Sequence, residues 1–306
     1  MKSLKLVPAE THIPFIGKRN LAMGLSAFFL VGSIVVFLMN GLNFGIDFKG
    51  GTLIEASSEE AVDIGALRER LGAMPLGEVQ IQEFGKATDV LIRIAELDGA
   101  TDTSNDLNAV QIVRDELAGD FDIRRVEIVG PQVSAELIQT GLLAVLAAIV
   151  SMLIYIWFRF EWQFSVGAVL ALVHDVVLTI GIFALLQLDF NLSILAAILT
   201  IVGYSMNDTV VVYDRVRENL RKYKKMDLGE LLDIAINETL SRTVMTSVTT
   251  MLALLALYAL GGEVIRGFTF AMIWGVLVGT YSSIFIASPL LMILGVKRDW
   301  SGAQVN

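Results

Sequence analysis

Long apolar runs recur along this chain. A helix needs about 20 mostly apolar residues to cross roughly 30 Å of bilayer hydrocarbon, because its backbone must satisfy its own hydrogen bonds there. Six segments meet this requirement: 21–39, 137–157, 164–186, 192–213, 243–260 and 268–294. The first run is longer than that of a secretory signal, and no A-x-A-like cleavage site follows it. The pattern therefore predicts a polytopic α-helical membrane protein with six transmembrane helices, the first of them a retained anchor.

The long segment between the first two runs, 40–136, has shorter periodicities. Alternation typical of strands covers 52–56, 78–84, 89–95 and 121–129, whereas 63–71 and 105–117 have helical spacing, and Asp63 is placed to cap the first of these helices. Gly85 and Lys86 mark a hairpin turn between the middle strands. The order β-α-β-β-α-β predicts one α+β ferredoxin-like domain, a fold that specifies no chemistry by itself.

Basic residues predict the orientation. With both termini in the cytoplasm, the inside segments hold 14 Lys and Arg residues and the short outside loops hold only Arg266. Segments rich in Lys and Arg stay in the cytoplasm, so residues 1–20, the basic loop 214–242 and the tail 295–306 are predicted to lie inside, and 40–136 outside. The basic cluster in 215–225 is a topology determinant and a surface for the acidic headgroups of the lipid bilayer, or a contact for another protein.

Composition removes several classes of protein. The 306 residues include no Cys and only two His, which excludes disulfides, thiolate nucleophiles and Cys- or His-rich metal sites, and we expect no metal and no cofactor. The net charge of −9 argues against nucleic acid as a partner. That charge is local, since 40–136 contains 19 acidic and 8 basic residues. The sequence thus predicts an acidic outside domain on a slightly basic membrane body.

Polar residues within the predicted spans are functional candidates, because ionisable groups at membrane depth are costly. His174 and Asp175 lie near the centre of the third span. In the fourth and fifth spans, polar residues share one helical face each: Thr200, Tyr204, Asn207 and Asp208, then Arg242, Thr246, Thr249 and Thr250. Helical rise places Asp208 and Thr246 at nearly the same depth, with Arg242 one turn deeper.

This spacing predicts an Asp208–Arg242 pair bridged by Thr246. Such a carboxylate can carry a proton, or the pair can be a fixed interhelical ion pair. His174 and Asp175 are either part of the same function or bonds between neighbouring helices.

A glycine-containing motif precedes the outside domain: Asn43-Phe-Gly-Ile-Asp-Phe-Lys-Gly-Gly. Gly45, Gly50 and Gly51 permit tight turns around Asp47, and the spacing is not that of a P-loop. The motif is either a rigid junction or a direct ligand contact. Without a nucleotide loop, a Gly-x-Gly-Asp protease motif or a filter sequence, the chain has no predicted catalytic residue and is not expected to be an enzyme, and an ion gradient is its expected energy source.

Three motifs of this chain carry a family resemblance. They are the junction motif, Gly203-Tyr-Ser-Met-Asn-Asp-Thr-Val-Val-Val-Tyr-Asp-Arg-Val-Arg-Glu-Asn219 and Leu240-Ser-Arg-Thr-Val-Met-Thr-Ser247. Together they resemble the SecF subunits of bacterial SecDF protein-export complexes, in the resistance-nodulation-division superfamily. The His174-Asp175 pair is similar too. The resemblance covers nearly the whole chain.

The resemblance implies a bacterial inner-membrane subunit with residues 40–136 in the periplasm. It implies SecD and the SecYEG channel as partners, and use of the proton-motive force to assist translocation of a preprotein. In that reading Asp208 is the protonatable group, Arg242 and Thr246 belong to its relay, and Asn207 and Tyr204 line it. The alternatives are a structural scaffold of the translocon and a small-molecule exporter of the same superfamily, for which the outside domain looks small.

Overall fold

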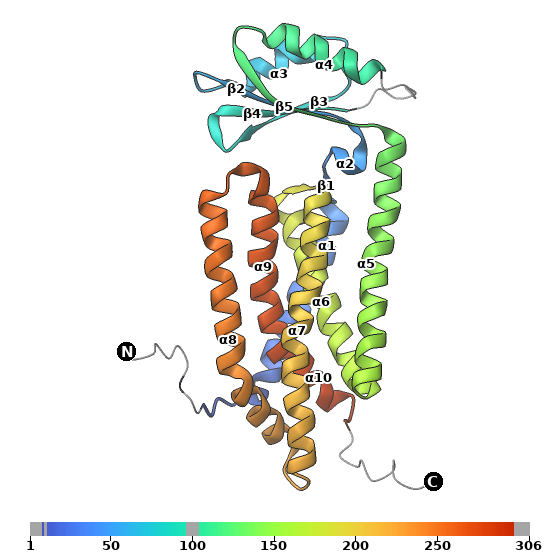
Figure 1. Cartoon of the computed structure of the whole chain (residues 1–306), viewed down its shortest axis with the longest axis vertical. Coiled ribbons are helices and arrows are strands. Elements are labelled where there is room, and N and C mark those ends of the chain that lie inside the picture. The colour runs from blue at the N-terminus through green and yellow to red at the C-terminus, as the bar shows by residue number, and fades with distance from the viewer. Residues whose placement is uncertain (1–7, 9–10, 96–103, 297–306) are drawn as a thin grey trace.

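The computed structural model describes residues 8, 11–95 and 104–296, and the ends of the predicted cytoplasmic termini, 1–7, 9–10 and 297–306, lie outside this part. Long helices form a bundle, and a small sheet covered by two helices stands at one end of it (Figure 1). The fold class predicted from the sequence is confirmed.

Six helices among the described residues are long and apolar enough to cross a membrane. They are α1 (Arg19–Asn40) after the short turn η1 (Ile16–Lys18), α5 (Pro131–Arg159), α6 (Trp162–Leu186), α7 (Leu192–Lys222), α8 (Leu228–Leu260), and a last span made of η2 (Glu263–Ile265), α9 (Arg266–Ser282), η3 (Ser283–Ala287) and α10 (Ser288–Ile293). The last span is interrupted: η3 is a π-helical turn, which the apolar pattern does not reveal.

The segment 214–242, expected to be a basic loop, is mainly helical. Helix α7 continues to Lys222 and α8 begins at Leu228, so the connection between them is short. Leu220, Leu231 and Leu232 are fully buried, and this packing extends both helices past the apolar runs that marked the spans. Hydropathy alone detects the part of a helix that crosses a bilayer, not the amphipathic part that continues beyond it.

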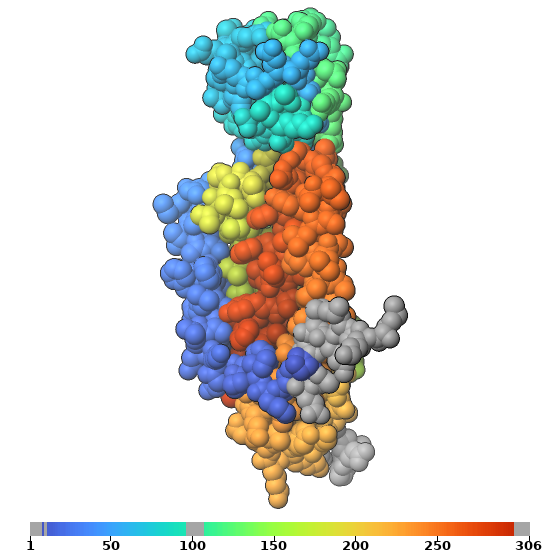
Figure 2. All heavy atoms as spheres, turned by 90° about the vertical axis from the view of Figure 1, so that its left-hand side faces the viewer, coloured from blue at the N-terminus to red at the C-terminus, as the bar shows by residue number. Residues whose placement is uncertain are grey.

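Burial separates inner from outer helices. Half or more of the apolar segments of α6, α7 and α9 is buried, whereas α1, α5 and α8 bury little of theirs. Figure 2 shows α1 in blue and α8 in orange on either side of the red α9. The inner helices therefore form the core of the bundle, and much of the apolar surface of the outer helices faces outward.

The sheet domain (residues 51–129) has the predicted β-α-β-β-α-β order. Its elements are β2 (Gly51–Ser58), α3 (Ile64–Gly72), β3 (Val79–Phe84), β4 (Lys86–Ile94), α4 (Ser104–Leu117) and β5 (Phe121–Val129). The antiparallel strands lie in the order β3-β4-β2-β5. Helices α3 and α4 cover one face, and the other face points toward the bundle (Figure 1). Asp63 caps α3 as expected, accepting hydrogen bonds from Gly65 N and Ala66 N at 2.9 and 3.1 Å.

The junction forms a small structure of its own. Strand β1 (Asn43–Phe44) pairs in parallel with β6 (Asp189–Phe190), which lies between α6 and α7, and the short helix α2 (Ile46–Lys49) follows. Gly50 and Gly51 have φ of +75° and +107°, a region that favours glycine. The sequence did not indicate the pairing of β1 with β6, because each strand has only two residues.

Candidate functional site

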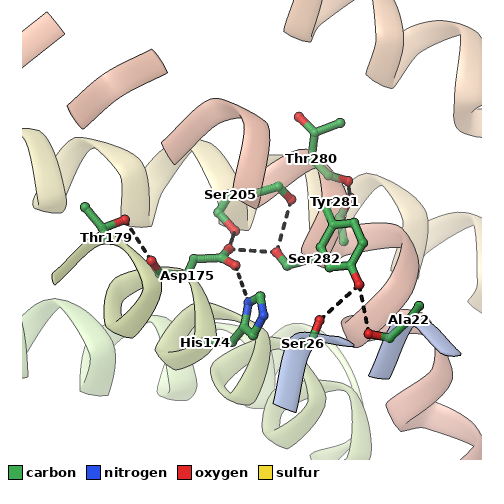
Figure 3. A network of polar contacts seen from close by, with 11 residues as sticks. Ala22, Ser26, His174, Asp175, Thr179, Ser205, Thr280, Tyr281 and Ser282 are labelled. Atoms are coloured by element: carbon green, nitrogen blue, oxygen red, sulfur yellow. Dashed lines mark hydrogen bonds and ion pairs between the residues drawn. The ribbon is translucent and has the colours of Figure 1, made fainter. Parts of the chain in front are cut away.

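The first buried polar group lies in the middle of α6. Asp175 has no exposed surface, and its Oδ1 lies 2.9 Å from His174 Nδ1 (Figure 3). Its Oδ2 accepts hydrogen bonds from Ser205 Oγ at 2.6 Å and Ser282 Oγ at 2.7 Å, so α7 and α9 both hold it. Three contacts to donor groups satisfy a carboxylate far from water, which makes burial of this group possible.

His174 completes this group. Its ring stacks on Tyr281, with centroids 6.4 Å apart, and Tyr281 Oη donates to the carbonyl of Ala22 on α1 (Figure 3). The other ring nitrogen, Nε2, is buried without a hydrogen-bond partner among the described residues. Few buried polar atoms in folded proteins lack a hydrogen-bond partner, so this nitrogen marks an unsatisfied position in the bundle.

The second buried polar group surrounds Asp208 on α7. Asp208 is 7% exposed and accepts from Thr243 Oγ1 of α8 at 2.6 Å and from Ser283 Oγ of η3 at 2.5 Å. Both partners are hydroxyl groups, which can accept as well as donate a hydrogen bond. The arrangement gives Asp208 neutral partners on both oxygens and leaves it able to exist with or without a proton.

The predicted bridge through Thr246 is wrong. Thr246 is exposed and donates to the backbone carbonyls of Arg242 and Thr243, and Thr243 instead contacts Asp208. Helical spacing placed the two threonines one turn apart on neighbouring faces, and the rotation of α8 decides which one turns inward. Arg242 is exposed and lies close enough to interact electrostatically with Asp208, but the described residues show no ion pair between them.

The predicted lining residues take different positions. Tyr204 is half-buried, and its hydroxyl reaches Ser247 Oγ at 3.4 Å, so it joins α7 to α8. Asn207 is exposed, and among the described residues it forms no hydrogen bond with a buried carboxylate. Asp208 and Asp175 thus lie inside, while Asn207 of α7 and Arg242 and Thr246 of α8 are exposed.

Four hydroxyl residues of the site were missed by sequence reasoning: Ser205, Thr243, Ser282 and Ser283. Ser205 lies three residues before Asp208, one turn away, and that spacing is a usable signal. For the others the sequence carries little information, since Ser and Thr in apolar helices commonly bond to their own backbone. Pro289 hints at an irregular last span, because proline removes a helix donor.

The junction residues reach the membrane helices. Asp47 Oδ2 accepts from the backbone N of Leu192 at 2.8 Å, at the first residue of α7. A Cβ on Gly45 would lie 3.2 Å from Asn191 Cβ, so a larger residue here would have to push these closely packed segments apart by a few tenths of an ångström. The junction therefore touches the start of the helix that carries Asp208, as a rigid connection would.

Asp189 of β6 connects the sheet domain to the bundle. It accepts from Asn43 Nδ2 at 2.8 Å and Gln82 Nε2 at 3.0 Å, and it forms an ion pair with Arg93 of β4. Gln82, Arg93 and Asp189 border a cavity of about 780 Å³ between the sheet and the bundle. Among the described residues, no cluster of three or more His, Asp or Glu side chains could hold a metal ion.

Comparisons with known proteins find the same family over nearly the whole chain. The family model "Protein export membrane protein SecD/SecF, C-terminal" matches residues 109–297, and the "SecD/SecF GG Motif" matches residues 35–62, which contain the junction. The protein translocase subunit SecF of Cereibacter sphaeroides is 48% identical, with 96% of this chain and 93% of that protein covered. The SecF of Rickettsia bellii is 44% identical, with coverage of 96% and 97%.

Solved structures show the same similarity. The crystal structure of SecDF from Thermus thermophilus, described as a translocon-associated membrane protein, matches with a TM-score of 0.85 and 35% identity. A SecDF in a super-membrane-facing form matches with a TM-score of 0.68. Each match covers 94% of this chain and 39% of the longer SecDF chain, so this chain spans well under half the length of those proteins.

Proposed function

The chain belongs to the SecF family of auxiliary Sec translocase subunits in protein export, and we propose that it uses the proton-motive force at Asp208 to assist preprotein translocation. It is a multi-pass protein of the bacterial inner membrane. The observation that carries the proposal is a carboxyl group buried in the middle helices of the bundle and held by hydroxyl groups alone.

The geometry supports a change of protonation at Asp208. Thr243 and Ser283 stabilise its carboxylate by donating, and each can rotate when the oxygen carries a proton. Arg242 lies near this carboxylate, and the described residues show no ion pair between the two that would fix the charge of Asp208. The alternative, a fixed interhelical ion pair between Asp208 and Arg242, would place the guanidinium in contact with the carboxylate.

The exposed polar residues of α7 and α8 support a partner on these helices. Arg242, Thr246 and Asn207 are exposed on helices expected to lie in the membrane, where a charged group facing lipid is costly. The apolar segment of α8 is also barely buried within this chain. We infer that SecD covers these exposed polar residues, and that the assembly lies beside the SecYEG channel.

The proposed orientation places both termini in the cytoplasm and the sheet domain in the periplasm. The short connection between α7 and α8, which is rich in basic residues, then lies inside, in agreement with the positive-inside rule. Arg266 at the start of α9 is the single basic residue of the short outside loops. In this orientation Asp208 lies within the membrane, between the sheet domain and the cytoplasmic ends of the helices.

The test compares export with and without a proton gradient. In membrane vesicles with normal amounts of the complex, Asp208→Asn is expected to abolish the stimulation of preprotein translocation by the gradient and to leave the gradient-independent part. Asp214→Asn is the matched control, because Asp214 lies on the same helix in an exposed ion pair with Arg159. Full stimulation in Asp208→Asn contradicts the proposal, and loss of SecD from the purified complex favours a scaffold role.

A further inference from the structure

The boundary between α9 and the π-helical turn η3 presents two adjacent serines to two different helices. Ser282 and Ser283 are both fully buried. Ser282 Oγ donates to Asp175 Oδ2 of α6 at 2.7 Å, and Ser283 Oγ donates to Asp208 Oδ2 of α7 at 2.5 Å. Single π turns inside α-helices are uncommon and are frequent at functional sites. Two neighbouring residues of the last span thus connect both buried carboxylates.

A second connection runs in parallel. Ser205 Oγ donates to the same Oδ2 of Asp175 at 2.6 Å (Figure 3), and Ser205 lies one turn before Asp208 on α7. The two carboxylates are therefore linked through adjacent residues of the last span and through one turn of α7. A change in hydrogen bonding at either carboxylate acts on the same pair of helices.

Each serine has an alternative acceptor within its own helix. Ser282 Oγ lies 3.1 Å from the carbonyl of Gly279, and Ser283 Oγ lies 3.0 Å from that of Thr280. A hydroxyl group has one hydrogen, so it donates to one acceptor at a time. An ionised carboxylate is the stronger acceptor, whereas a protonated carboxyl is a weaker one and supplies a donor of its own.

We propose that Ser282 and Ser283 are positioning residues that transmit the protonation states of Asp175 and Asp208 to the last span. The inference rests on the proposed proton uptake at Asp208. While the carboxylates are charged, the serines tie the last span to α6 and α7. When a carboxyl takes up a proton, its serine turns to the helix carbonyl and the tie is released.

The surroundings of each carboxylate are compatible with this exchange. The titratable or charged groups near them, among the described residues, are His174 and Tyr281 beside Asp175 and Arg242 beside Asp208. The π turn is also held by Ser288, whose hydroxyl donates to the carbonyl of Ser283. Conversion of such a turn to regular α-helix would rotate the following helix by about 100° and move it by about 1.5 Å.

The absence of cysteine from the chain allows a direct measurement of this movement. Spin labels on Phe158→Cys and Ile293→Cys, at positions 88% and 67% exposed near the ends of α5 and α10, report the distance between these helices in the full chain in lipid vesicles. Ser283→Ala and Asp208→Asn, in which the amide imitates a protonated carboxyl, are expected to shift the distance distribution in the same direction. The double variant is expected to shift it no further, because both changes break one tie.

Ser282→Ala and Asp175→Asn form an independent pair with the same expectation. Ser165→Ala is the matched control, since that buried serine of α6 donates to the backbone carbonyl of Leu153, and it should retain the parent distribution. The proposal is overturned if the serine variants behave like Ser165→Ala, or if their shifts add to those of the carboxyl variants. The distance measurement uses no proton gradient, so its failure would contradict only the role of the two serines. The proposed function is tested separately, and it would be contradicted if Asp208→Asn retained the stimulation of export by the gradient.

Discussion

Asp89 of β4 is nearly buried in the sheet domain and is held as a carboxylate by its neighbours. Ser57 Oγ donates to its Oδ1 at 2.6 Å, and Arg124 Nη1 contacts its Oδ2 at 3.1 Å. The hydroxyl of Ser57 first, and then the charge of Arg124, lower the pKa of Asp89, against the opposing effect of burial. This group therefore links the stability of the sheet domain to pH.

The sign of that link can be tested. The stabilisation that the Asp89 carboxylate gives the folded domain is complete above the pKa of this group in the unfolded chain, about 3.9. It is lost as the pH falls through the lower pKa of Asp89 in the folded domain. We expect Ser57→Ala to reduce the free energy of unfolding by roughly 1 kcal/mol at pH 6, and the difference to narrow below about pH 3.9. Hydrogen exchange of the β2 and β4 amides in the full chain measures it at each pH.

Ser58→Ala is the control for this experiment, because the Ser58 hydroxyl contacts the backbone N of Glu60 and no carboxylate. A difference between parent and Ser57→Ala that stays constant from pH 6 to pH 3 would contradict the account.

Single residues also show what sequence can predict about the site. Asp208 was found because an acidic residue in an apolar run is rare and costly. Its partners were not found, since a hydroxyl residue in such a helix bonds to its own backbone as readily as to a neighbour. Thr243 and Thr246 illustrate this: both are compatible with the pattern, and only the rotation of α8 places Thr243 against Asp208.

Pairs of helices approach closely where glycine replaces a side chain. At Gly181 of α6, an added Cβ would lie 2.2 Å from Ser33 Cβ and 2.9 Å from Ser33 Cα of α1, so backbone as well as side chain blocks it. Small residues at such crossings let helices in a membrane pack through van der Waals contact. This contact is one of the attachments of α1 to the bundle.

We expect Gly181→Ala to destabilise the packing of α1 on α6 by about 1–3 kcal/mol, because the helices must separate. Thermal unfolding in detergent measures the loss, and cross-linking of cysteines placed on α1 and α6 locates it. Gly24→Ala, on α1 with open space at its Cβ, should leave stability unchanged or slightly improved. Equal effects of the two variants would argue that the crossing at Gly181 does not hold α1.

Elements were predictable to different degrees. The strand β5 and the capped helix α3 follow directly from alternation and from Asp63. The extensions of α7 and α8 beyond the apolar runs were missed, because their packing in the basic segment depends on a few buried leucines. The π turn was also missed, since nothing in the apolar pattern of the last span distinguishes one added residue in a turn.

At the scale of the molecule, Asp189 is one of the points where the sheet domain rests on the bundle. The side chains of Arg93 and Asp189 are 12% and 28% exposed, so water weakens this ion pair less than a surface one. Asn43 and Gln82 donate to the same carboxylate. The junction, the sheet and the loop before α7 thus meet at one residue, and the loop before α7 leads directly into the helix with Asp208.

Removing this carboxylate should loosen the sheet domain from the bundle. A partly buried hydrogen bond to a charged group contributes about 2 kcal/mol, so Asp189→Ala should lower the ratio of docked to undocked molecules about thirtyfold. Spin labels on Ala87→Cys of β4 and Leu260→Cys at the end of α8, both exposed, should give a broader and longer distance distribution. Asp122→Asn, an exposed acid on β5, should retain the parent distribution. An unchanged distance distribution in Asp189→Ala would contradict this account. It would show that the covalent connections through α2 and α5 hold the sheet domain in place without the ion pair.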